Sequence, residues 1–316
     1  MAAPVSEFDR LPDNILLDIL SYLSVKDRCI SGRVCRRWRK ILMDNTLWRH
    51  VNLLPYQLDL RKMWKFVRAH LSEQLKTLKI RGCPDPKTNE VKPPLSESMV
   101  EDLKGRCPSL YWLHIEPGNV TNLSSAALLP SSLTHLTLLK NTWQPRWLKD
   151  CGAALPNLIY LDLSETVRID NQDVKDIAEF TKLQTLKLDG CYRLSEQGLQ
   201  EIPKALTSLT SLSLSKCNTT DLVAHHIGRN LKELRELDLS YSKSLTSSSL
   251  PALAEGLTKL EYLNLDWCMH LTLHHIPGLA KSKSLRKLSL VAENFLWPDF
   301  EIEPYRAMMP DCELNV

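Results

Sequence analysis

Cysteine and histidine are the side chains of this 316-residue chain that could ligate a metal or act as nucleophiles, and there are nine of each. No two cysteines are spaced C-x-x-C and their number is odd, which fits neither a zinc ribbon nor a disulfide framework. The pairs His225-His226 and His274-His275 are expected on solvent-facing helices, without the further ligands that a metal needs. Phosphate-binding and nucleophile motifs such as G-x-x-x-x-G-K-S/T, G-x-G-x-x-G and G-x-S-x-G are absent from the sequence. We therefore expect no metal site, no cofactor and no catalysis.

The cysteines instead mark an internal repeat. Leu183, Leu186, Leu188 and Cys191 follow the spacing L-x-x-L-x-L-x-x-C. The leucines that begin this pattern lie 23 to 26 residues apart, except for a first gap of 35 residues. They are Leu75, Leu110, Leu133, Leu158, Leu183, Leu209, Leu234, Leu260 and Leu285, and a further unit falls due at Asp311-x-x-Leu314-x-Val316. A period this regular is typical of a leucine-rich repeat array.

The repeat gives the cysteines a structural explanation. Cys191, Cys217 and Cys268 occupy the ninth position, where a small and weakly polar side chain faces inward at the turn after each strand. Free cysteine packs as a small hydrophobic residue with a weak hydrogen-bond donor. We expect these three thiols to be buried and unligated.

Each repeat predicts one short strand followed by one helix. After Cys191, Ser195 is the expected helix N-cap, and Leu199 and Ile202 recur at helical spacing. Neither element can bury its apolar face alone, so the repeats should stack into a curved α/β solenoid with short parallel strands on the concave side and helices on the convex side. Trp48-x-x-Val51-x-Leu53, with a helix expected over 60–71, predicts a junction repeat. The solenoid would thus span residues 51–316 with about nine to ten repeats.

The first 50 residues do not repeat and predict three short helices. Residues 11–23 place apolar side chains on one broad helical stripe, Ser24 and Asp27 fit a capping box, and a third stripe ends at Leu42. A core this small is too limited to be robust by itself, so much of its apolar surface should face a partner. A plain helical cap over the end of the solenoid is the alternative.

These N-terminal motifs resemble an F-box over residues 8–50: Leu11-Pro12, the run from Ile15 to Leu23, Val34-Cys35-Arg36-Arg37-Trp38 and Leu47-Trp48. With the cysteine-containing repeats, nearly the whole chain resembles the F-box/leucine-rich-repeat proteins. The resemblance implies an F-box in residues 1–50 that binds a Skp-type adaptor, through which a cullin and a RING subunit form an SCF ubiquitin ligase complex. It implies a non-catalytic receptor that holds a protein substrate for ubiquitination and degradation. A ligase-independent repeat scaffold or inhibitor is the alternative function.

The same resemblance assigns residues to the adaptor surface. They are Leu11, Pro12, Ile15, Leu16, Ile19, Leu20, Leu23, Val25, Val34, Trp38 and Leu47.

Substrate recognition is expected on the concave face, at the third, fifth and seventh positions of each repeat. The candidate residues there, with one just past its strand, are Trp112, Tyr160, Asp162, Asp189, Glu236, Asp238, Tyr262, Asp266 and Trp267. Aromatic anchors among charges are typical of protein interfaces. The acidic members are expected to form a row across neighbouring strands that attracts a basic segment, although every strand must expose something and a solvated face would look similar. The insertion from Pro84 to Pro94 is expected to be an exposed loop, either inert or used for recognition.

The charge distribution and the search for targeting segments constrain the function only weakly. Residues 1–70 contain 13 Lys or Arg against 7 Asp or Glu, which would suit an acidic partner of the N-terminal helices. The net charge of the whole chain, +3, does not indicate nucleic-acid binding. No apolar stretch approaches the ~20 residues that span a bilayer, and the N-terminus does not read as a signal peptide. We expect a protein of the cytoplasm, the nucleus or both, with neither nucleic acid nor membrane as a partner.

Overall fold

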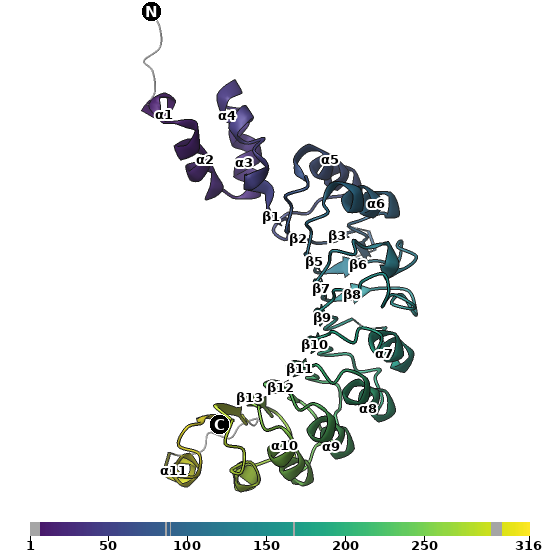
Figure 1. The fold of residues 1–316 in the computed structure, drawn as a ribbon, viewed down its shortest axis with the longest axis vertical. Coiled ribbons are helices and arrows are strands. Elements are labelled where there is room, and N and C mark those ends of the chain that lie inside the picture. The colour runs from purple at the N-terminus through teal and green to yellow at the C-terminus, as the bar shows by residue number, and fades with distance from the viewer. Residues whose placement is uncertain (1–6, 86, 89, 167, 292–298) are drawn as a thin grey trace, which may run out of the picture.

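A computed structural model describes residues 7–85, 87–88, 90–166, 168–291 and 299–316. The protein is an arc with a small helical lobe at its N-terminal end (Figure 1). Strands line the inner side of the arc and helices cover its outer side, as the repeat pattern predicts. None of the helices in these ranges is long and apolar enough to cross a membrane.

One parallel sheet of 11 strands runs the length of the arc, in the order in which its strands occur along the chain. Its strands are β1 (His50–Asn52), β2 (Thr77–Ile80), β5 (Trp112–Ile115), β7 (His135–Leu138), β9 (Tyr160–Asp162), β10 (Thr185–Lys187), β11 (Ser211–Ser213), β12 (Glu236–Asp238), β13 (Tyr262–Asn264), β14 (Lys287–Ser289) and β15 (Glu313–Asn315). The register aligns the central leucine of each repeat, so that Leu186 pairs with both Leu161 and Leu212. The predicted junction repeat is confirmed by β1 and the predicted last unit by β15.

The convex side carries one helical segment in most repeats. These segments are α5 (Leu60–His70), α6 (Glu97–Arg106), η2 (Ala126–Leu128), α7 (Asn171–Ile177), α8 (Glu196–Ala205), α9 (Asp221–Asn230), η3 (Ser247–Ser249) with α10 (Leu250–Gly256), η4 (Leu273–Gly278) and α11 (Asp299–Met308). The stretch between β7 and β9 contains no helix, and the fully buried rings of Trp143 and Trp147 fill that space instead. Large aromatic side chains thus replace the leucines that a helix would have supplied.

Two small sheets lie outside the main one. The insertion between Pro84 and Pro94 was expected to be an exposed loop, but its ends pair as β3 (Cys83–Pro84) and β4 (Val91–Lys92) in an antiparallel hairpin. An ion pair of 2.8 Å between Lys92 Nζ and Asp85 Oδ2 links the two sides of this hairpin. Strands β6 (Gly118–Asn119) and β8 (Asn141–Thr142) pair in parallel beside the central repeats.

The N-terminal lobe consists of α1 (Glu7–Arg10), α2 (Asp13–Ser21), α3 (Val25–Ser31), α4 (Arg36–Ile41) and η1 (Asn45–Trp48). Ser24 caps α3 as its sequence predicts, because its Oγ accepts the Asp27 backbone N–H at 3.2 Å. The buried side chains of the lobe belong to the same apolar cluster as the leucines of the solenoid. Trp48 lies in both units, since it ends η1 and packs on Phe66 of α5 with ring centroids 5.7 Å apart. The lobe is therefore fixed to the first repeats without a flexible linker.

In five repeats, the ninth-position side chain joins the repeat to the one before it, whereas the buried Oγ of the ninth-position Ser242 has no such partner. Cys217 Sγ donates to the carbonyl oxygen of Leu188, the sixth residue of the preceding repeat, at 2.9 Å. A backbone carbonyl that faces the dry interior needs such a donor, because an unpaired buried polar group is destabilising. The same contact recurs, donor first, in Asn141–Ile115, Thr166–Leu138, Cys191–Leu163 and Cys268–Leu239. The predicted burial of Cys191, Cys217 and Cys268 is confirmed, and each thiol has a backbone carbonyl as its acceptor.

We predict that the ninth-position thiols resist alkylation. Burial raises the pKa of Cys217 to about 12 and that of Cys268 to about 11, so little reactive thiolate exists at pH 8. Cys35, by contrast, is exposed. Iodoacetamide labelling followed by peptide mass spectrometry should modify Cys35 in the folded protein, and Cys217 and Cys268 only after denaturation. Labelling of Cys217 at a rate similar to Cys35 would show that the repeat interior is open.

Candidate functional site

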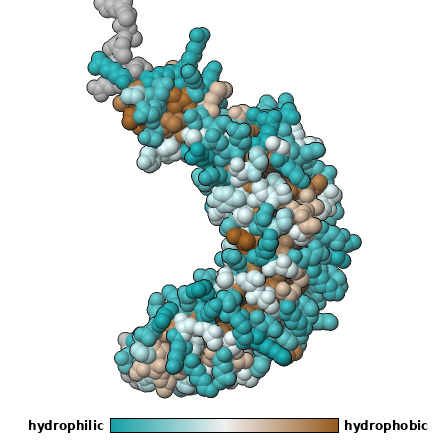
Figure 2. Space-filling model, viewed as in Figure 1, coloured by the Kyte–Doolittle hydropathy of each residue, from teal (hydrophilic) through white to brown (hydrophobic). Residues whose placement is uncertain are grey.

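The N-terminal lobe exposes an apolar surface of its own. Along α2, Leu16 and Leu20 are buried, whereas Ile15 and Ile19 on the adjacent face are each 40% exposed. Residues four apart lie on one face of a helix, so the broad apolar stripe of α2 divides into an inner and an outer row. Figure 2 shows hydrophobic surface on this lobe. Exposed apolar patches of this kind usually mark protein-binding sites.

The residues predicted for the adaptor surface fall into three groups. Pro12, Ile15, Ile19 and Val34 are exposed. Leu11, Leu23, Val25 and Trp38 are half-buried, while Leu16, Leu20 and Leu47 belong to the core of the protein. Leu16, Leu20 and Leu47 can contribute to adaptor binding only indirectly, by holding the exposed residues in place.

The lobe exposes further large apolar side chains outside the predicted set. Tyr22 at the end of α2 is 91% exposed, and Ile30 of α3 is also exposed. Phe8 packs edge-on against Trp38, with ring centroids 6.2 Å apart. Sequence reasoning missed these residues because each lies outside the helical stripe that signalled the others. The sequence feature that could have indicated them is the high density of large apolar residues in so short a helical segment.

Arg28 fixes the relative position of the helices that carry this patch. Its guanidinium donates from Nε to the Leu20 carbonyl at 3.3 Å and from Nη2 to the Ser21 carbonyl at 2.5 Å. A third bond from Nη1 reaches the carbonyl oxygen of Leu47 in η1. One side chain from α3 therefore bonds to carbonyl groups at the end of α2 and in η1, where few helical donors remain. The Leu20 carbonyl also accepts the Leu23 backbone N–H at 3.2 Å.

On the concave side, the third positions of the central repeats form a ladder of rings. Trp112, His135 and Tyr160 are direct partners in β5, β7 and β9. The centroid distance is 5.7 Å between Trp112 and His135 and 5.4 Å between His135 and Tyr160. Lys79 Nζ lies 4.6 Å from the centre of the Trp112 ring. Burial and the neighbouring Asp162 raise the pKa of Tyr160 to about 12, so its hydroxyl stays neutral.

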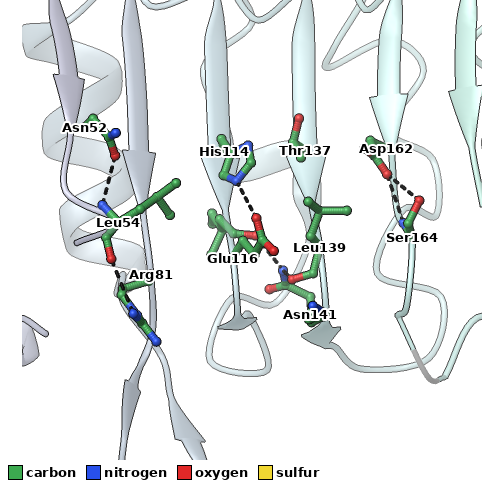
Figure 3. Close-up of polar contacts among 12 residues, drawn as sticks. Asn52, Leu54, Arg81, His114, Glu116, Thr137, Leu139, Asn141, Asp162 and Ser164 are labelled. Carbon is green, nitrogen blue, oxygen red and sulfur yellow. Dashed lines mark hydrogen bonds and ion pairs between the residues drawn. The ribbon is translucent and has the colours of Figure 1, made fainter. Parts of the chain in front are cut away.

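The fifth positions, one step nearer the strand ends, are used differently. Asp162 Oδ1 accepts from the backbone N–H and the Oγ of Ser164, at 3.1 and 2.7 Å (Figure 3). Asn52 accepts the Leu54 N–H in the same way at 3.0 Å. Asp238 Oδ1 repeats this pattern on Ser240 at 2.9 and 2.6 Å, and its Oδ2 accepts from Asn264 Nδ2 at 2.9 Å. These groups satisfy backbone donors where the chain leaves each strand.

The seventh-position carboxylates hold the following strand. Asp189 Oδ1 accepts the N–H of Ser215 at 2.9 Å, and Asp266 Oδ1 accepts the N–H of Val291 at 2.7 Å. Burial raises the pKa of Asp189, although the hydrogen bonds from Ser213 and Ser215 oppose that effect. Carboxylates engaged in this way are less available to a partner.

The expected continuous acidic row is wrong. The register places Lys187 and Ser213 between Asp162 and Asp238, so the two carboxylates are not neighbours in their row. Asp189 and Asp266 each lie two residues beyond the end of their strands. Tyr262 and the exposed Glu236 belong to the third-position row. The last candidate, Trp267, lies beyond its strand in a left-handed turn with φ 60°. The repeat spacing predicted the strand positions correctly, but not which side chains would bond to the backbone.

We predict that Asp238→Ala destabilises the solenoid by about 1–2 kcal/mol, because it leaves the Ser240 backbone N–H without its acceptor. The control is Glu236→Ala in the same strand, since Glu236 is exposed and should change stability by less than about 0.5 kcal/mol. Urea unfolding followed by circular dichroism measures both. Equal stability of the two variants would show that the Asp238 contacts contribute nothing.

A helical lobe with an exposed apolar patch, fixed to a curved parallel solenoid, defines a protein-binding repeat protein. The family model for F-box-like domains matches residues 8–54. The chain is 32% identical to F-box/LRR-repeat protein 12 of Homo sapiens over 261 residues, which cover 81% of this chain and 78% of that protein. The mouse protein of that name is 31% identical, with 80% and 77% covered. The chain belongs to the F-box/LRR-repeat protein family.

More distant comparisons agree in fold. F-box/LRR-repeat protein 4 of Bos taurus is 28% identical over 83% of this chain, but only 38% of that protein is covered. The crystal structure of the yeast Rad7 and Elc1 complex matches with a TM-score of 0.54 at 16% identity, over 96% of this chain and 88% of that chain. Family membership implies a Skp-type adaptor for the F-box and a substrate-receptor role in SCF-type ligases, and proteins of this family are generally adaptors rather than enzymes.

Proposed function

We propose that this protein is the substrate-recognition subunit of an SCF E3 ubiquitin ligase, acting in the cytoplasm, the nucleus or both. Its F-box would bind the Skp-type adaptor and, through it, the cullin and RING subunits. The observation that supports this most is the number of large apolar side chains exposed on one small lobe, namely Ile15, Ile19, Tyr22, Ile30 and Val34, in addition to its buried core. A plain cap over the solenoid would need only the buried face of α2.

The mechanism that fits this architecture is positioning. The apolar core is continuous from Leu16 through Trp48 to the last repeats, so adaptor and substrate would be held at a fixed separation. A substrate lysine kept near the ubiquitin-charged enzyme gains in rate because the reaction becomes effectively intramolecular. The protein itself would carry out no bond-making step.

We predict that Ile15→Asp with Ile19→Asp weakens adaptor binding more than tenfold, or by about 1.4 kcal/mol or more, because two charges replace apolar contacts. Both side chains are exposed, so the thermal unfolding temperature should stay close to wild type. Leu222→Asp on α9, also exposed but far along the solenoid, is the matched control and should bind normally. Calorimetry with purified adaptor measures the affinity; undiminished binding by the double variant would refute the F-box assignment.

Association with a cullin separates the ligase from a ligase-independent scaffold. The wild-type chain and the Leu222→Asp control should both co-purify with adaptor and cullin, whereas the Ile15/Ile19 variant should lose both. Recovery of the solenoid's partners without any cullin in all three preparations would favour the scaffold.

We predict that Trp112→Ala with Tyr160→Ala impairs substrate ubiquitination while adaptor binding is unchanged. These two rings end the aromatic ladder on the concave face, and truncated aromatic anchors commonly cost 2 kcal/mol or more at interfaces, about a 30-fold loss. Thr185→Ala with Ser211→Ala changes the same row in the next two strands and serves as the control. The substrates to follow are proteins that accumulate when residues 8–54 are deleted. If their ubiquitination is equal in both variants, the ladder is not the anchor.

A further inference from the structure

The eighth position of successive repeats adopts a left-handed backbone conformation. It is occupied by Lys140, Glu165, Gly190, Lys216, Tyr241 and Trp267, all with φ between 53° and 70°. This conformation lets the backbone N–H of each residue reach the strand end of the next repeat. Tyr241 N donates to the Asp266 carbonyl and Trp267 N to the Val291 carbonyl, both at 2.7 Å. The fold therefore requires a positive φ at this position, whatever the side chain.

Bulky residues are an unfavourable choice there. Glycine adopts a positive φ without steric cost, as Gly190 does, whereas aromatic side chains rarely do. Tyr241 and Trp267 nevertheless occupy two successive eighth positions, and their rings stack at 5.4 Å with an interplanar angle of 4°. Lys216 Nζ lies 5.0 Å from the centre of the Tyr241 ring, on the repeat before. Strained residues of this kind tend to occur at binding sites, where the side chain serves another purpose.

This edge ladder, formed by Lys216, Tyr241 and Trp267, is accessible. Tyr241 is 40% exposed, and Met269, two residues beyond Trp267, is 70% exposed. Tyr192, two residues beyond Gly190, is 65% exposed. Tyrosine, tryptophan and methionine are enriched in protein interfaces relative to the rest of the surface.

Exposed basic side chains surround the edge ladder. Lys216, Lys243 and Arg193 are exposed, and within the described ranges no carboxylate lies at ion-pair distance from any of them. The nearest eighth-position carboxylate in the chain, Glu165, faces Lys140 at 3.7 Å. On the adjoining strand ends, the carboxylates of Asp238 and Asp266 already accept backbone N–H groups. Unpaired cations beside exposed rings are complementary to an acidic segment that also carries an apolar side chain.

We propose that the edge ladder binds an extended acidic segment of the partner protein, with one carboxylate on Lys216 and one apolar side chain against Trp267. Neighbouring strands lie ~4.8 Å apart, so Lys216 and Trp267, two repeats apart, are separated by about 10 Å along the edge. An extended chain advances ~3.3 Å per residue, so about 10 Å corresponds to three residues. The edge ladder therefore selects an Asp or Glu three residues from a large apolar side chain. This inference names part of what the substrate surface recognises, and so rests on the proposed function.

Selection from a random dodecapeptide phage library on the immobilised full chain tests the proposal. Enriched peptides should share an acidic residue and an aromatic or large aliphatic residue three positions apart. With Lys216→Glu the same library should instead yield a basic residue at that place, a change of specificity that a loss of folding could not produce. Lys140→Glu changes a cation at an equivalent position two repeats before Gly190 and should leave the selected motif unchanged.

Fluorescence anisotropy with the best synthetic peptide completes the test. Trp267→Gly should weaken its binding about tenfold or more while preserving the fold, because glycine accepts the left-handed conformation. A peptide with the same composition but adjacent acidic and apolar residues should bind more weakly than the selected one. No enrichment, a motif without an acidic residue, or an unchanged motif with Lys216→Glu would each overturn the proposal. Because neither measurement involves adaptor or cullin, these failures are distinct from failure of the ligase assignment.

Discussion

The structure depends on how each repeat satisfies the backbone groups at the end of a strand only three or four residues long. The sixth-position carbonyl faces a dry interior, where an unpaired polar group is costly. In five repeats the ninth residue of the next repeat supplies the donor, from a thiol as in Cys217, a hydroxyl in Thr166 or an amide in Asn141. These repeats thus complete their neighbours, and the array is stable only as a stack. Cysteine suits the place because it is small and apolar enough to pack among leucines while it still carries a weak donor.

The same logic explains how the F-box lobe joins the solenoid. An array must cover its first repeat, and here the lobe does so through Trp48, whose indole Nε1 donates to the Leu42 carbonyl at 2.8 Å while its ring contacts α5. The first repeat is capped by the same helical lobe that presents Ile15 and Ile19 outward. One side of the lobe therefore covers the solenoid end, and its other side is available to bind a partner. Through this arrangement the lobe holds a bound partner at a fixed position relative to the first repeats.

The features that follow from the spacing of the repeats alone were predicted from the sequence. Leucine spacing located the strands, the junction repeat at Val51 and the last strand at Leu314, because a regular period forces a common register. It could not predict which isoleucines of α2 face outward, since a stripe that broad is apolar on both its inner and outer rows. Nor did it reveal that Asp162 and Asp238 accept backbone N–H groups. An aspartate at a strand end can bond either to the backbone or to a partner protein, and the sequence does not distinguish the two. The short hairpin at Cys83 was missed because prolines and charges in its sequence are also typical of loops.

These backbone demands decide which concave positions remain free for recognition. At the fifth and seventh positions, near the strand ends, Asp and Asn side chains are drawn to nearby N–H groups, as Asp162 and Asp189 show. Third-position side chains belong to the first residue of each strand, where the sheet already pairs the backbone, so rings such as Trp112 and His135 contact one another instead. A substitution there changes the surface without removing a partner from the backbone. At the eighth position the backbone is constrained, because its N–H is bonded to the next repeat and its φ is positive. The side chain at this position is not needed for those backbone contacts. Specificity in such a solenoid is therefore expected to vary at the third and eighth positions, while the fifth and seventh keep the strand ends together.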